Sequence, residues 1–304
     1  MTKSMFQSPE AKAVLGSWFE RFRAKLPAPT ESRTVPTRFG DTHVLVGGPA
    51  GAPPLVMLHG ALASSAHLLG ELAPLLERFR IYAVDVIGQS VKSADAQLSV
   101  KNDDYGRWLE DVLDALALPR ASVLGVSWGG FVAIRFAAVA PERITRLALL
   151  TPAGMVNGPA WAGLTKVMIP MQLYRLFPSE RRLAASLRHL LTTHGDDWTP
   201  YLGDAFRMYR MNMRIPALAR PAELARLTAP VLVLGADQDL SFPGSALLAR
   251  ARELFPNLAV AELLEGSRHC PPTTPEFRRM LSARVAAFLA DAPAAQAAAA
   301  AAAG

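Results

Sequence analysis

The stretch that most constrains the fold covers residues 121–134 and reads ASVLGVSWGGFVAI. An apolar run typical of a buried strand meets Ser127 inside a Gly-x-Ser-x-Gly pattern, and helix-like spacing begins directly afterwards. Such a turn holds the serine at strained backbone angles, and side chains at Gly125 and Gly129 would collide where strand and helix cross. The stretch therefore predicts a nucleophile elbow, which presents the Ser127 hydroxyl at the edge of a sheet.

Strand-like apolar runs alternate with amphipathic helices along most of the chain. Residues 9–26 predict a packed helix, with a membrane-surface helix as the alternative because its polar face is basic. Residues 34–39 and 43–46 predict a β-hairpin, and the leucines of 68–76 predict one helix. Buried-strand runs follow at 55–58, 81–84, 122–126, 144–150, 231–235 and 258–264. This order predicts an α/β fold with a mostly parallel central sheet flanked by helices.

The alternation divides the chain into segments. Residues 1–30 form an N-terminal helical segment, and the α/β core is expected at 31–152 and 222–292. Between these two parts, residues 153–221 carry no strand pattern and predict several short helices rich in methionine and aromatic residues. Residues 293–304 are an Ala-rich tail that we expect to be disordered, because so short a piece is a marginal helix alone.

The composition narrows the classes of partner. The net charge of +6 is spread along the chain without a nucleic-acid motif, so we expect no nucleic-acid partner. The single cysteine, Cys270, and the lack of a signal-peptide pattern or a bilayer-length apolar run suit a cytoplasmic protein without integral membrane association. No metal-ligand or phosphate-loop motif is visible, so we expect no metal and no cofactor. The oligomeric state stays open.

A serine nucleophile needs a base, and His269 is the best candidate. In open α/β sheets the chemistry gathers at the carboxyl ends of the strands, and His269 lies just past the last predicted strand. His59 also follows a strand, but its neighbour Gly60 indicates that it shapes a loop. The remaining histidines lie in the hairpin, at a helix start and in the helical insertion: His43, His67, His189 and His194.

The acid that orients this base should follow another strand end. Asp237 and Asp239 both follow the 231–235 run, and no carboxylate follows the 144–150 run. We favour Asp239 because Pro243 lies four residues further on, a spacing that belongs to the family resemblance described below. Asp237 is interpreted as a turn residue, a role that aspartate often fills, and stays the alternative acid.

The order Ser127, Asp239, His269 is the order of the α/β-hydrolase triad, and the chain resembles that superfamily over residues 35–289. Four motifs carry the resemblance: His59-Gly60 after a strand, the DVIGQS segment at 85–90, the elbow, and Asp239 with Pro243 followed by His269. Within the superfamily the chain looks like bacterial serine carboxylesterases with a small helical cap inserted after the sixth strand, which is where the helical insertion falls.

The resemblance implies a mechanism. Ser127 would attack an acyl carbonyl, His269 would accept its proton, and Asp239 would hold the imidazole in the needed tautomer. Backbone N–H groups of Trp128 and of either Ala61 or Leu62 would form the oxyanion hole, with His59, Gly60, Gly125 and Gly129 in support. The expected substrate is a small apolar ester or acyl compound.

Several alternatives stay open. The same triad serves carbon–carbon bond hydrolases, thioesterases, acyltransferases and cofactor-free peroxidase-like enzymes, although the ALASS loop after Gly60 is less Gly-rich than in the carbon–carbon hydrolases. A non-catalytic binding member of the fold typically lacks a triad residue, and none is missing. Epoxide hydrolases and haloalkane dehalogenases of this fold use an aspartate where Ser127 stands.

The methionines and aromatics of 153–221 either line an apolar pocket or pack the cap.

Overall fold

The computed structural model describes residues 4–194, 196–210 and 214–290, so the predicted Ala-rich tail lies outside the described residues. An eight-stranded sheet forms the centre of the described chain, in the order β1-β2-β4-β3-β5-β6-β7-β8. The pairs β1–β2 and β2–β4 are antiparallel, and every later neighbouring pair is parallel. The strands are β1 (Glu31–Val35), β2 (Thr42–Gly47), β3 (Pro54–Leu58), β4 (Arg80–Val84), β5 (Ala121–Val126), β6 (Ile144–Leu150), β7 (Val231–Ala236) and β8 (Leu258–Leu264).

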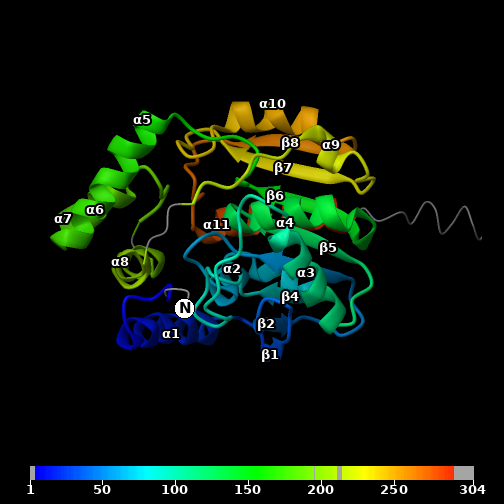
Figure 1. Ribbon diagram of the computed structural model, residues 1–304, viewed down its shortest axis with the longest axis horizontal. Helices are drawn as coiled ribbons and strands as arrows, with labels where there is room; N and C mark the ends of the chain where they lie inside the picture. The colour runs from blue at the N-terminus through cyan, green and yellow to red at the C-terminus, as the bar shows by residue number, and fades with distance from the viewer. Residues whose placement is uncertain (1–3, 195, 211–213, 291–304) are drawn as a thin grey trace, which may run out of the picture.

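Helices cover both faces of this sheet (Figure 1). An apolar cluster lies on each face of the sheet. Along β3, Val56 and Leu58 belong to one cluster, and Leu55 and Met57 belong to the other, because successive side chains of a strand point to opposite faces. The first cluster packs under α3 (Asp104–Ala115), α4 (Trp128–Val139), α9 (Pro221–Leu224) and α10 (Gly244–Leu254). The second packs under α1 (Pro9–Ala24), α2 (Ser65–Glu71) and α11 (Pro275–Ala290).

The first helix is packed against the rest of the protein. Ser8 caps α1 by accepting a hydrogen bond from the Ala11 N–H, and Leu15 and Phe19 are 1% exposed. Because the apolar side of α1 is buried, the structure favours the packed helix over the membrane-surface alternative. No helix among the described residues has the length and apolar character needed to cross a membrane.

The segment between β6 and β7 holds a group of helices at one end of the molecule (Figure 1). Trp18 of α1 donates a hydrogen bond to Asp204 in this group, at 2.8 Å, which ties the group to the N-terminal helix. The helices are α5 (Ala160–Gly163), the π-helical turn η3 (Leu164–Met168), α6 (Ile169–Leu176), α7 (Glu180–Leu187) and α8 (Trp198–Met208).

Two sequence predictions were wrong in detail. The first hairpin strand is Glu31–Val35 rather than 34–39, because Pro36 lacks an N–H for the ladder and the Thr37 hydroxyl closes a turn onto the Gly40 carbonyl at 2.6 Å. The single helix predicted over the leucines of 68–76 is divided into α2 and a 3-10 helix, η1 (Ala73–Glu77), with Pro74 at the break.

Candidate active site

The turn between β5 and α4 holds Ser127 at φ 51° and ψ −110°, which is the strained conformation that the elbow requires. The Ser127 N–H donates to the carbonyl of Leu150 on the neighbouring strand, at 2.9 Å. A Cβ atom on Gly125 would lie 2.5 Å from the carbonyl oxygen of Gly129. The strand and the helix can therefore cross this closely only with glycine at that position.

His269 lies in the loop after β8 and contacts Ser127. Its Nε2 atom lies 2.9 Å from the Ser127 Oγ atom, although the two residues are 142 positions apart in the sequence. The ring of Phe242 packs edge-on against the imidazole, with ring centroids 5.3 Å apart. The imidazole therefore has a fixed orientation, with one ring nitrogen directed at the serine.

Asp239 holds the other ring nitrogen. Its Oδ2 atom lies 2.8 Å from His269 Nδ1, and its Oδ1 atom accepts hydrogen bonds from the N–H groups of Ser241 at 2.7 Å and Phe242 at 3.1 Å. The Asp239 side chain is fully buried. Asp237 points elsewhere, because its carboxylate accepts the N–H groups of Gly266 and Ser267 at 3.0 and 2.9 Å.

The electrostatics of the pair favour a protonated imidazole. Burial by itself lowers the pKa of His269, but the charge of Asp239 and the hydrogen bond to it outweigh burial, so the pKa is raised above its ordinary value. The site therefore stabilises positive charge on His269, which is the charge that a base acquires when it accepts the serine proton.

The loop after β3 brings backbone N–H groups close to Ser127. A Cβ atom on Gly60 would lie 3.4 Å from Ser127 Cβ, and Leu62 has a φ of 58°. Trp128 is the first residue of α4, so its N–H has no acceptor within the helix. Among the described residues, the N–H groups of Ala61, Leu62 and Trp128 have no hydrogen-bond acceptor. Ala61 and Leu62 also line the cavity beside Ser127.

His59 connects this loop to the loop after β4 through two hydrogen bonds. It is fully buried, its Nδ1 donates to the Gly60 carbonyl at 2.7 Å, and its Nε2 accepts the Val86 N–H at 2.9 Å. Both ring nitrogens are used with the imidazole neutral, and burial lowers its pKa. His59 is therefore a positioning residue of the loop.

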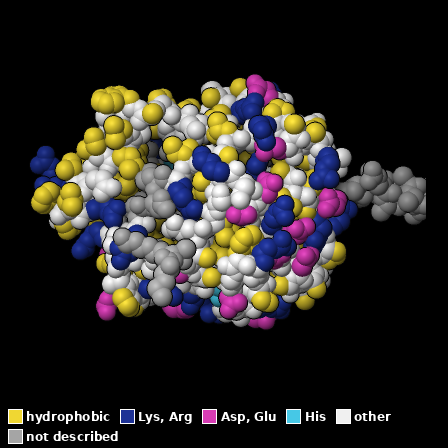
Figure 2. Space-filling model, viewed as in Figure 1, with side chains coloured by type: hydrophobic (Ala, Val, Ile, Leu, Met, Phe, Trp, Pro, Cys, Tyr) yellow, Lys and Arg dark blue, Asp and Glu magenta, His cyan; other side chains and the backbone are white. Residues whose placement is uncertain are grey.

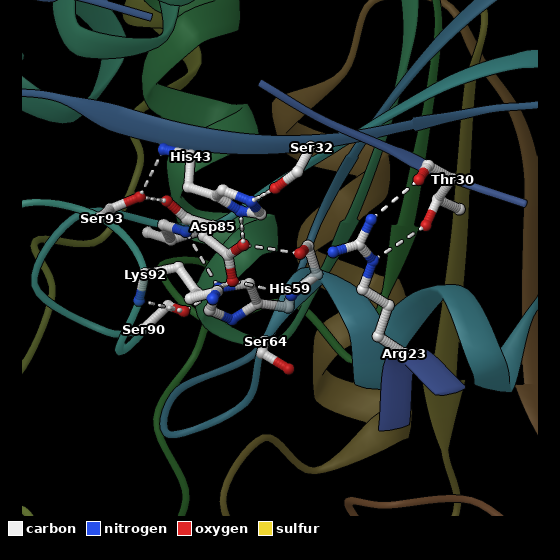
Figure 3. Close-up of polar contacts among 12 residues, drawn as sticks. Arg23, Thr30, Ser32, His43, His59, Ser64, Asp85, Ser90, Lys92 and Ser93 are labelled. Atoms are coloured by element: carbon white, nitrogen blue, oxygen red, sulfur yellow. Dashed lines mark hydrogen bonds and ion pairs between the residues drawn. The ribbon is translucent and has the colours of Figure 1, made fainter. Parts of the chain in front are cut away.

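Asp85 anchors the end of the same loop (Figure 3). The sequence alone did not reveal this role. The buried carboxylate accepts the N–H and hydroxyl of Ser65 at 2.9 and 2.6 Å, the hydroxyl of Ser90 at 2.6 Å, and the ring N–H of His43 at 2.7 Å. Burial by itself would raise the pKa of Asp85, but the nearby histidines His43 and His59 and the hydrogen bond from Ser65 lower it below its ordinary value. A buried anion thus fixes the start of α2 and, with it, the end of the loop that faces Ser127.

A cavity of about 250 Å³ opens beside the Ser127 hydroxyl. Its wall is mainly apolar and comes from the core, from α8 and from α11. The lining residues include Leu68, Leu72, Leu150, Leu190, Trp198, Leu202, Phe206, Phe277 and Leu281. Cys270 also borders the cavity, and burial raises the pKa of its thiol to about 12, so the thiol is neutral.

One part of the cavity wall is polar. Arg278 of α11 forms a two-pronged ion pair with Glu71 of α2, and the ring of His67 stacks on Trp198 with centroids 3.7 Å apart. Burial lowers the pKa of His67 to about 3, so this ring is neutral. The ion pair carries no net charge, and it leaves the wall polar without making it strongly cationic or anionic. In the described residues, no group of three or more His, Cys, Asp or Glu side chains is arranged to hold a metal ion.

Parallel strands with helices on both faces, an elbow after β5 and a Ser–His–Asp contact at the strand ends define an α/β hydrolase. The family model of the alpha/beta hydrolase fold matches residues 53–220, which is more than half of the chain. The chain therefore belongs to the α/β-hydrolase fold family.

The chain is similar in sequence to named proteins and in fold to solved crystal structures. The chain is 42% identical over 127 residues to an uncharacterised carboxylesterase, nap, of Bacillus subtilis, a match covering 42% of each protein. The chain thus matches less than half the length of this relative. It is 27% identical to haloalkane dehalogenase 2 of Mycobacterium tuberculosis, over 77% of this chain and 87% of that protein. The crystal structure of naproxen esterase (carboxylesterase NP) from Bacillus subtilis superposes with a TM-score of 0.78 and 26% identity, covering 93% of this chain and 99% of that one.

Proposed function

We propose that the protein is a serine carboxylesterase that hydrolyses small apolar esters. The observation that carries this proposal is the unbroken hydrogen-bonded chain from Ser127 Oγ through His269 to Asp239, beside an apolar cavity. The likeness to carboxylesterases of Bacillus subtilis supports the same reaction class. Under this proposal residues 153–221 act as a cap on the core, and a cytoplasmic location stays a prediction.

The reaction begins at the serine. Ser127 Oγ attacks the ester carbonyl carbon while its proton moves to His269 Nε2. Asp239 stabilises the imidazolium through its charge and its hydrogen bond, which raise the pKa of His269. The tetrahedral intermediate then loses its alcohol, which takes the proton from His269. Water, deprotonated by the same imidazole, attacks the acyl-enzyme, and the carboxylic acid leaves as Ser127 recovers its proton.

The oxyanion of this intermediate needs hydrogen-bond donors. The Trp128 N–H follows the nucleophile directly and stands at the positive end of the α4 dipole. The second donor is the N–H of Ala61 or of Leu62, and both remain candidates. One such donor contributes about 2.7–4 kcal/mol to transition-state stabilisation in other serine hydrolases.

The substrate class follows from the cavity and the nucleophile. A mainly apolar volume of about 250 Å³ suits a short alkyl or a single aryl group. The chain also resembles a haloalkane dehalogenase along much of its length, but a serine stands at position 127 where dehalogenases of this fold use an aspartate. The nucleophile therefore favours acyl transfer over halide displacement.

A two-part experiment tests the proposal. A fluorophosphonate probe should label the wild-type protein at Ser127 and fail to label Ser127→Ala, and the same substitution should abolish hydrolysis of p-nitrophenyl butyrate. A panel of esters and thioesters of graded chain length separates esterase from thioesterase activity, and an added alcohol that is converted into a new ester would reveal acyltransferase activity. A folded wild-type protein that neither labels nor cleaves any ester of the panel would refute the proposal.

A further inference from the structure

The helices between β6 and β7 expose large apolar side chains on one outer face. Trp161 is 75% exposed, Leu176 is 69% exposed and Phe177 is 58% exposed, which is unusual for side chains of this size on a water-facing surface. Figure 2 shows hydrophobic side chains gathered over α5, α6 and α7, at the end of the molecule away from the sheet. We call this surface the cap face; it comprises Trp161, Leu164, Ile169, Leu173, Leu176 and Phe177.

The cap face is one side of an amphipathic helical segment whose other side is packed. Its members recur every one to five residues from α5 through η3 to the end of α6. Met171 and Tyr174 of α6 are 3% and 7% exposed and belong to the apolar core. The segment therefore already buries one apolar side within the protein, and the cap face is a second apolar side without a partner in the described chain.

Basic side chains outnumber acidic ones in the sequence around the cap face. Residues 153–194 carry five basic side chains and a single acidic one, Glu180. Lys166, Arg181, Arg182 and Arg188 are exposed, and Arg175 is partly exposed. The Arg182 guanidinium lies over the ring of Phe177, 5.6 Å from its centroid, so cation and apolar side chain share one surface.

We propose that the cap face binds an anionic lipid surface, such as a bilayer or micelle that contains acidic headgroups. The helical segment would lie in the plane of the interface, with Leu and Ile side chains among the acyl chains and the Lys and Arg side chains at the headgroups. Trp161 is the most exposed member of the face, and Trp is the side chain that prefers the headgroup region. Exposed apolar side chains together with exposed basic ones, of which Arg182 lies against Phe177, match an anionic lipid surface in both respects.

This binding does not depend on the catalytic proposal. The cap face lies outside the lining of the cavity beside Ser127. Docking through the cap face would leave the catalytic side chains in place. The two proposals can therefore fail separately, and binding can be measured on a protein without its nucleophile.

The test uses full-length Ser127→Ala protein and sedimentation with sucrose-loaded vesicles. Equimolar phosphatidylglycerol and phosphatidylcholine vesicles should bind the protein, and pure phosphatidylcholine vesicles should bind it at least tenfold more weakly. Lys166→Gln with Arg181→Gln should weaken binding by about fivefold for each charge removed. Raising the salt concentration should weaken binding as well.

Two apolar substitutions complete the test. Trp161→Ser with Leu176→Ser should weaken vesicle binding at least tenfold, because both side chains lose their burial in the lipid. Met280→Ser is the matched control, since Met280 is 48% exposed on α11, a different element, and should bind like the parent. Circular dichroism and thermal melting establish that each variant is folded.

Three outcomes would overturn the proposal. Absence of binding to the anionic vesicles is the first, and equal loss of binding in Met280→Ser and in the cap-face variant is the second. The third is a dimer in light scattering that Leu176→Ser dissociates, because a second copy of the chain would then occupy the cap face.

Discussion

Gly129, in the first turn of α4, lies directly against the carbonyl oxygen of Leu58 at the end of β3. A Cβ atom added to Gly129 would stand 2.1 Å from that oxygen, which is far inside any real contact distance. Strand β3, the neighbour of β5, therefore leaves no room for a side chain at position 129 of α4. The position of Ser127 depends on glycine at that place.

Gly129→Ala should consequently destabilise the protein by about 3 kcal/mol or more, because backbone atoms rather than a flexible side chain must move. Gly163→Ala is the control: nothing lies within 4 Å of its Cβ position, the residue is helical, and alanine should be neutral or stabilise by up to about 1 kcal/mol. Urea unfolding of both variants measures the difference. Equal free energies of unfolding for the two variants would contradict the contact.

The carboxylates of Asp239 and Asp237 contact different groups, so replacing each of them with asparagine should have different effects on catalysis. Asp239→Asn removes the charge beside His269 and should lower kcat by about 10⁴-fold. Asp237→Asn keeps an acceptor for only one of the Gly266 and Ser267 N–H groups, but it does not remove the charge beside His269, so kcat should stay within about threefold of wild type, a small change for a group that only braces a turn. Steady-state hydrolysis of p-nitrophenyl butyrate decides between them. A larger loss in Asp237→Asn would reverse the assignment of the acid.

The pH dependence of kcat/KM should report the ionisation of His269. Only the neutral imidazole can accept the serine proton, so activity should rise with pH through the pKa of His269, which lies above its ordinary value. In Asp239→Asn the raising influence is lost while burial still lowers the pKa, so the midpoint of the residual activity should move to lower pH. A midpoint that moves up, or does not move, would contradict the contact between the two side chains.

Leu202 lines the cavity and is 2% exposed, so its size should limit the length of the acyl group. In Leu202→Ala the ratio of kcat/KM for p-nitrophenyl octanoate to that for the butyrate should rise about tenfold. Leu187→Ala removes an equally buried leucine from α7 outside the cavity lining and should leave the ratio unchanged. The same response in both variants would mean that packing of the helices, rather than the cavity, sets the preference.

The sequence allowed the fold to be predicted because most elements carry their own local signal. Ser127 lies in a strand–turn–helix pattern, and His269 and Asp239 each follow an apolar run, so the topology of a parallel sheet predicts their meeting. The hydrogen bonds between the three agree with that prediction, while their catalytic roles remain proposals.

Other parts of the site have no local signal. Arg278 meets Glu71 from 207 positions away, and His43 of the hairpin reaches Asp85 from 42 positions away. The positive φ of Leu62 could not be predicted either, because glycine is the usual sign of this conformation and position 62 is a leucine. These features depend on how distant elements pack, which hydrophobic periodicity does not specify.

The pairing of β6 with β7 has a consequence for how this protein can change. Leu150 lies beside Leu234 in the sheet, although the segment between the two strands is about 80 residues long. The entropy of closing a flexible loop grows only slowly with length, by about 0.6 kcal/mol for each doubling. Insertions or exchanges between these strands therefore cost little folding free energy, and evolution can rewrite the helices around the cavity while the sheet that holds Ser127 keeps its register.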